Sequence, residues 1–174
     1  MTPQALSQDE VAGLLDANAA AVAAELRALP DEALRWHPDA GEWCVQEALG
    51  HVIEAERRGF AGRIREMLTA EEPTLKGWDQ VEVARGRRDC DKPLEALLKE
   101  FLDERSASVQ LVDGLTDRDL ERAGTHEVVG RLTVAELLHE WVHHDRNHFR
   151  QMLANVQAYA WPQMGNAQRF SEPH

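Results

Sequence analysis

The amino-acid sequence predicts an all-α fold, a four-helix bundle with a long link between its second and third helices. Four segments of roughly twenty residues carry apolar side chains at three- and four-residue steps. Most of these segments begin with a capping signal, and no segment alternates in polarity as a strand does. With 174 residues the chain suits a single domain. We expect this domain to span residues 1–160, and the C-terminal tail, residues 161–174, to be polar and irregular from Gln163 onward.

The first two helices are marked by capping boxes. In this motif the N-cap side chain accepts from the amide three residues on, and a Glu at that position reaches back. The first helix opens at Ser7, with Glu10 in the reciprocal position, and Pro30 ends it. The second follows Cys44, which stands at the N-cap position with Glu47 three residues later, and fades near residue 69.

The link between the second and third helices covers residues 70–90. It contains Gly and Pro, and a loop of this length inside a compact domain is either a binding loop or a crossover between distant helices. We interpret it as a crossover between distant helices, because Trp78 is the only residue in it that suggests ligand binding. The third helix begins at Asp91, with Pro93 in its first turn, and ends at Gly114.

The fourth helix begins after another capping box, formed by Thr133 and Glu136. Its apolar pattern predicts a helix from Val134 to about Ala158, before Pro162. This helix carries most of the residues that suggest chemistry.

Composition excludes several classes of function. Lys and Arg number 19 against 31 Asp and Glu, a formal net charge of −12, so binding to phosphate backbones or anionic lipid is not expected. No apolar run reaches the ~18 residues of a membrane span, and the N-terminus has no signal-peptide pattern. Cys44 and Cys90 are too few for a disulfide framework and lack metal-type pairing. We therefore expect a soluble protein of the reducing cytoplasm.

The histidines are the strongest chemical signal. The chain has 8, and a short stretch of the fourth helix holds His139, His143, His144 and His148. Two pairs are spaced i, i+4, which places two imidazoles one turn apart on one helix face, where they can share a metal ion. A helical wheel places His144 and His148 at the edge of the apolar sector and the other two on the polar face.

The wheel leaves one question open. Asp145 and Asn155 fall within the sector that should be buried. Either Asp145 is buried and pairs with a residue of another helix, or the wheel places the boundary of the buried sector slightly wrongly.

A third metal ligand must come from another helix, and His51 is the candidate. It lies near the start of the second helix, between Ala48 and Ala55, whose small side chains leave room for a metal or a substrate. Three neutral imidazoles leave an open coordination position on Zn, Ni, Fe or Mn, which is typical of a reactive site.

Several polar groups near these histidines could orient a ligand or act as a base. We take Glu47 and Glu54 as candidate bases and Gln151 as an orienting group, and we interpret Glu140 as a solvated charge. The remaining histidines and four of the tryptophans are interpreted as surface, hydrogen-bonded or core residues: His37, His126, His139, His143, His174, Trp36, Trp43, Trp141 and Trp161.

Three stretches of the sequence resemble the DinB-like family of damage-inducible proteins. Residues 41–51, from Gly41 to His51, resemble its early motif. Residues 137–151 resemble its late motif, which has the form His, three residues, His, two residues, Gln and falls here on His144, His148 and Gln151. The segment 125–133 resembles one large branch of the family.

The resemblance implies a four-helix bundle with a long link and a divalent metal on His51, His144 and His148. It also implies a homodimer, which is frequent in this family. Characterised relatives of this kind are metal-dependent enzymes that transfer or use low-molecular-weight thiols, and others are proposed hydrolases. Cys44 departs from the family, which usually has Ser at this position.

Three functional hypotheses follow. The first is a metal-dependent S-transferase, in which the metal holds a low-molecular-weight thiol as thiolate and presents it to an electrophile. The second is a metal-dependent hydrolase with Glu47 or Glu54 as the base. The third is a non-enzymatic metal-binding or ligand-binding stress protein. We expect a small-molecule substrate and a homodimer, without a nucleic-acid or membrane partner.

Overall fold

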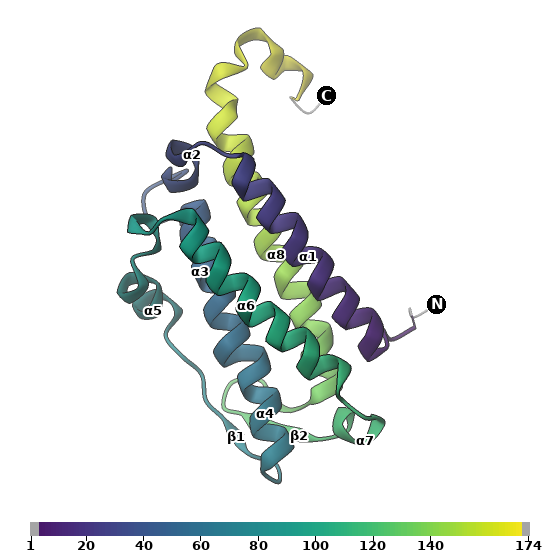
Figure 1. Cartoon of the computed structure of the whole chain (residues 1–174). Helices are drawn as coiled ribbons and strands as arrows, with labels where there is room; N and C mark the ends of the chain where they lie inside the picture. Colours follow the sequence, from purple (N-terminus) through teal and green to yellow (C-terminus); the bar gives the residue numbers. More distant parts are fainter. Residues whose placement is uncertain (1–3, 172–174) are drawn as a thin grey trace.

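The computed structural model describes residues 4–171. Four long helical units lie side by side along most of the length of the molecule (Figure 1). One of these units is continuous but carries three labels, because α3 runs on through the π-helix η1 into α4. The units are α1 (Gln8–Ala28), α3–η1–α4 (Val45–Glu54, Ala55–Phe60 and Ala61–Thr69), α6 (Leu94–Asp113) and α8 (Val134–Ala160).

The four units form a ring in which consecutive units are not all neighbours. Both α1 and α3 pack against α6 and α8, so α1 and α3 face each other across the bundle. The long link carries the chain from α4 back to the start of α6 (Figure 1). The predicted fold class, an all-α four-helix bundle with a long second link, is therefore confirmed.

Capping signals position the long helices as the sequence predicts. Reciprocal capping boxes form between Ser7 and Glu10, between Cys44 and Glu47, and between Thr133 and Glu136. The helix ends differ slightly from the predicted ones, since α6 starts at Leu94 and α8 continues to Ala160. The apolar faces form two buried clusters along the bundle, one of which contains Trp141 and Ile64.

The π-helix η1 was not predicted. Here one turn of the second helical unit is widened, and a π-helix of this kind commonly lies at a functional site. It ends at Phe60, whose ring stacks on Trp141 of α8 with centroids 5.0 Å apart.

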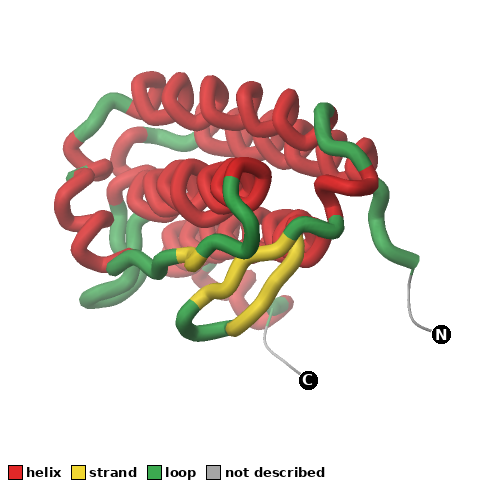
Figure 2. Tube along the Cα trace, turned by 90° about the horizontal axis from the view of Figure 1, so that it is seen from below, coloured by secondary structure: helices red, strands yellow, loops and turns green. Residues whose placement is uncertain are grey.

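The absence of strand-like alternation in the sequence did not reveal a small sheet. Three short strands form one sheet at an end of the bundle, β1 (Thr74–Leu75), β2 (Ala123–His126) and β3 (Gly130–Thr133) (Figure 2). Strand β2 pairs parallel with β1 and antiparallel with β3. Strands of two to four residues are too short to show alternation, and β1 meets β2 only because the bundle brings them together.

Short helices complete the described part of the chain, and several lie where irregular structure was expected. The link contains α5 (Gln80–Arg87) and η2 (Asp89–Asp91), and the tail contains the 3-10 helices η3 (Trp161–Gln163) and η4 (Gly165–Phe170). The prediction of an irregular tail was therefore wrong up to residue 170, and residues 172–174 lie outside the described part. The remaining short helices are α2 (Asp31–Arg35) and α7 (Asp117–Leu120). Within the described residues, no helix is long and apolar enough to cross a membrane.

Candidate metal centre

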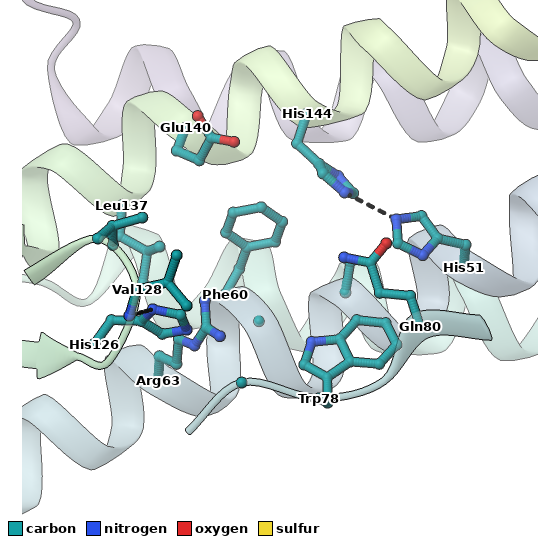
Figure 3. A pocket seen from close by; sticks show the side chains of 14 residues that line it. His51, Phe60, Arg63, Trp78, Gln80, His126, Val128, Leu137, Glu140 and His144 are labelled. Carbon is teal, nitrogen blue, oxygen red and sulfur yellow. Dashed lines mark hydrogen bonds between the residues drawn. The ribbon is translucent and has the colours of Figure 1, made fainter. Parts of the chain in front are cut away.

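The structure brings His51, His144 and His148 together inside the bundle. His51 extends from α3, and the other two lie one turn apart on α8. One ring nitrogen from each of the three lies within 4.8 Å of the others. Nε2 of His51 and Nε2 of His144 are 3.2 Å apart (Figure 3). Two nitrogens bound to one tetrahedral zinc ion at about 2.0–2.1 Å would be separated by roughly 3.4 Å, so this spacing suits a shared cation.

Hydrogen bonding leaves suitable nitrogens available for a cation. Nδ1 of His148 lies 2.9 Å from Oε1 of Gln151, an oxygen that can only accept, so this nitrogen carries the proton and Nε2 is left with its lone pair. Nδ1 of His51 and Nδ1 of His144 are buried without a hydrogen-bond partner in the described residues. If these two nitrogens carry the protons, all three Nε2 lone pairs are free for a cation. The donor set therefore fits a divalent metal.

Burial also keeps the ligands in the form that binds metal. Burial and the neighbouring ring of His148 lower the pKa of His51 to about 4. Burial and the nearby His148 and His51 lower the pKa of His144 to about 3. Both rings are therefore neutral at neutral pH, and protons do not compete with a metal there.

A pocket of about 360 Å³ opens beside His51 and His144. Its wall combines residues from the second helical unit, the link, the β2–β3 hairpin and α8 (Figure 3). The link contributes Gly77, Trp78 and Gln80, and the Trp78 ring stacks on His51 with centroids 5.7 Å apart. The link thus crosses the bundle, as predicted, and also lines the pocket, which we did not predict.

Arg63 is a pocket residue that the sequence analysis missed. It lies on α4, just beyond the π-helix, and lines the pocket together with Phe60 and His126. Its Nη2 donates to the carbonyl of Lys76 at 3.1 Å, but its Nε is buried without a partner in the described residues. A half-buried guanidinium with an unused donor is suited to an anionic group of a bound molecule.

The two carboxylates predicted as bases are engaged elsewhere. Glu47 caps α3, where its Oε2 accepts from the amide of Cys44 and lies 3.0 Å from His37. Glu54 is buried among arginines and binds Arg58 and Arg87. Neither carboxylate lines the pocket.

Glu140 lines the pocket instead (Figure 3). It precedes His144 by one helical turn on α8, so the two side chains share a face of the helix. Its exposure agrees with our interpretation of a solvated charge, but its position beside the histidines makes it the candidate base.

The open question about Asp145 is resolved in favour of a buried partner. Its Oδ2 accepts from Nη1 of Arg105 on α6 at 2.6 Å, and both side chains are almost fully buried. The wheel was wrong for His139, which is half-buried: its Nε2 accepts from the amide of Leu6 at 3.0 Å. His143 is exposed, as predicted.

The prediction that Cys44 and Cys90 are too few for a disulfide framework and lack metal-type pairing was wrong. Their sulfur atoms are in bonding contact, although 46 residues separate them in the sequence. The fold brings them together because η2 packs against the first turns of α3.

The fold and the three convergent histidines define the class, a four-helix protein with a candidate site for one divalent metal ion. The model of the DinB superfamily matches residues 14–152, and the chain belongs to this superfamily. A protein of Oceanobacillus iheyensis provisionally named a metal-dependent hydrolase is 25% identical over 123 residues, covering 71% of this chain and 70% of its own. The Bacillus subtilis protein YuaE is 28% identical over 140 residues, which cover 74% of this chain and 86% of YuaE.

A solved structure shares the fold. YfiT from Bacillus subtilis, described as a probable metal-dependent hydrolase with an unusual four-helix bundle topology, superposes with a TM-score of 0.82. The match covers 92% of this chain and 94% of YfiT at 18% sequence identity. The similarity therefore establishes that the two proteins share a fold.

Proposed function

We propose that the protein is a divalent-metal-dependent hydrolase of a small molecule that carries an acidic group. The convergence of His51, His144 and His148 beside an open pocket is the observation that carries this proposal. The names given to the Oceanobacillus relative and to YfiT point to the same class of reaction.

The three imidazoles would hold the cation, which would supply Lewis acidity beside the pocket. Glu140 is the side chain of this chain that takes a proton from the attacking water and returns it to the leaving group. Arg63 binds the acidic end of the substrate through its unused Nε donor. Phe60 and Trp78 form the aromatic wall against which the rest of the substrate packs.

Transfer of a low-molecular-weight thiol is the second candidate. The same three histidines would serve it, and the wall of Phe60 and Trp78 suits an apolar electrophile. Thiol transfer needs no base that acts on water, so the effect of replacing Glu140 on activity distinguishes the two reactions.

The test compares both reactions on one preparation loaded with Zn²⁺, Ni²⁺, Mn²⁺ or Fe²⁺. One arm measures hydrolysis of carboxylated esters and amides, and the other measures conjugation of a carboxylated thiol to an aromatic electrophile. We expect hydrolysis that is lost in His144→Ala and falls about 100-fold or more in Glu140→Gln. Conjugation that requires His144 but is indifferent to Glu140→Gln would replace hydrolysis by thiol transfer. Metal-loaded protein inactive in both arms would contradict the enzymatic proposal.

A further inference from the structure

A second group of metal-type donors lies at the start of α3, outside the pocket. It consists of His37 from the loop after α2, Cys44 and Glu47 from the N-terminus of α3, and Cys90 from η2. One donor atom from each of the four residues lies within 4.8 Å of the others. Three separate segments of the chain therefore meet at this point.

The chemistry of this group differs from that of the histidine site. Two thiols, an imidazole and a carboxylate are donors that zinc accepts, and four protein donors fill a tetrahedral shell. The histidine site offers three nitrogens and leaves a position open. A closed shell that contains sulfur is typical of a structural zinc site, whereas an open shell is typical of a reactive one.

The group is held together by contacts that do not involve sulfur. The buried amide of Gln46 donates from Nε2 to the carbonyls of Asp89 and Lys92, at 2.7 and 3.0 Å. Gly50 lets the Asp89 side chain approach the helix, where Arg87 and Lys92 bind its carboxylate. These contacts fix η2 against α3, so Cys90 stays beside Cys44 whether or not the two sulfurs are bonded.

The cysteine backbones are spaced widely enough for a cation between the sulfurs. The Cα atoms of Cys44 and Cys90 are 7.2 Å apart, beyond the roughly 4.4–6.8 Å usual for bridged cysteines. Two thiolates on one zinc ion each lie about 2.3 Å from the metal, which lets their sulfurs separate well beyond a covalent bond. A carboxylate has two oxygens, so Glu47 can keep its cap while it binds a cation.

We propose that His37, Cys44, Glu47 and Cys90 form a second, structural Zn²⁺ site when the cysteines are reduced. The structure shows the oxidised pair. Two molecules of a thiol reductant open the bond, giving two cysteine thiols and one reductant disulfide. Zn²⁺ then binds the two sulfurs and releases two protons, while His37 and Glu47 supply lone pairs.

The experiment uses Co²⁺ as a spectroscopic substitute for Zn²⁺ on the full-length protein reduced with a phosphine. A sulfur ligand gives Co²⁺ a thiolate charge-transfer band in the near ultraviolet, which a site of three histidines cannot give. Metal bound per chain is measured by elemental analysis in the same samples. The variants are Cys90→Ser, His37→Gln and His148→Ala, and exposed His143→Gln is the control. Circular dichroism checks that each variant is folded.

Reduced wild-type protein and His143→Gln should bind two Co²⁺ ions and show the thiolate band. Cys90→Ser should lose the band and one ion, whereas His148→Ala should keep the band and lose the other ion. His37→Gln should bind the thiolate-coordinated ion at least ten-fold more weakly. Reduced wild-type protein without the band would overturn the site. An unchanged affinity in His37→Gln would overturn the four-residue donor set.

Discussion

Arg105 of α6 and Asp145 of α8 form a buried ion pair with Nη1 and Oδ2 2.6 Å apart. Asp145 directly follows His144, and the same guanidinium binds Glu56 of the π-helix. One cation in the interior thus links α6, the π-helix and the ligand-bearing helix. It fixes the position of α8 from which His144 and His148 extend.

Replacing Arg105 with Ala should lower the free energy of unfolding by about 3–5 kcal/mol, because two buried carboxylates lose their counter-charge. Chemical denaturation measures the change. The comparison is Arg27→Ala, which breaks an exposed ion pair to Glu95 and should cost no more than about 1 kcal/mol. Equal losses in the two variants would show that the buried cation is not a structural anchor.

Replacing His148 with Ala should abolish binding of a divalent cation at the histidine site, because two imidazoles from different helices then remain. Calorimetric titration of the Cys90→Ser protein with Zn²⁺ measures this site alone. His143→Ala, which removes an exposed ring on the same helix, should leave the affinity unchanged. Unchanged binding in His148→Ala would exclude this residue from the ligand set.

Gln151 should matter for metal affinity although it is not a ligand. Its Oε1 accepts from Nδ1 of His148 and holds the ring so that Nε2 points away from that bond. Gln151→Leu should weaken metal binding about 10- to 100-fold. Gln163→Leu, at an exposed position in η3, is the control. Equal affinities in the same titration would mean that the hydrogen bond does not orient the ligand.

Replacement by Ala should change the stability of the protein in opposite directions at two glycines. A Cβ at Gly50 would lie 1.8 Å from Oδ2 of Asp89, so Gly50→Ala should destabilise the protein by about 1–3 kcal/mol. A Cβ at Gly13 meets nothing within 4 Å, so Gly13→Ala should stabilise α1 by about 0.5–1 kcal/mol. Thermal melts of both variants check the signs. A stable Gly50→Ala protein would show that η2 is free to move away from α3.

The metal-free protein should lose stability as the pH falls below about 6.5. His51 and His144 have pKa values lowered to about 4 and about 3, so the unfolded chain takes up protons that the folded chain does not. Each ring contributes a slope of up to about 1.4 kcal/mol per pH unit between its folded and unfolded pKa values. Urea unfolding of the apo protein from pH 7 to pH 5 measures it. A His51→Gln variant with the same slope would contradict this assignment.

The sequence predicted the helices well because their signals are local. Apolar spacing and capping boxes act within a few residues, so Ser7 and Thr133 marked helix starts that the structure confirms. The short strands could not be predicted, because β1 and β2 gain their partners only through the bundle. The π-helix could not be predicted either, because a helical wheel assumes the same rotation for every residue and cannot represent a widened turn.

The candidate site was predictable in part. One wheel placed His144 and His148 together, since both lie on a single helix. The wheel also marked Asp145 as anomalous, but nothing in it could name Arg105, which lies on another helix. Glu47 and Glu54 were predicted as bases because each lies about one helical turn from His51. Their partners His37 and Arg87 come from the loop after α2 and from the link, so only the tertiary structure reveals where these carboxylates bind.

The π-helix gives the second helical unit one extra residue in a single turn, and this sets the angle at which everything after it faces the pocket. Phe60 ends the widened turn and Arg63 follows it, whereas His51 precedes it. Deleting one residue there would rotate the downstream side chains by roughly 100°, turning Arg63 away from the pocket and the buried Ile64 and Met67 out of the core. The widened turn therefore couples the composition of the pocket wall to the packing of the core, so neither can change alone.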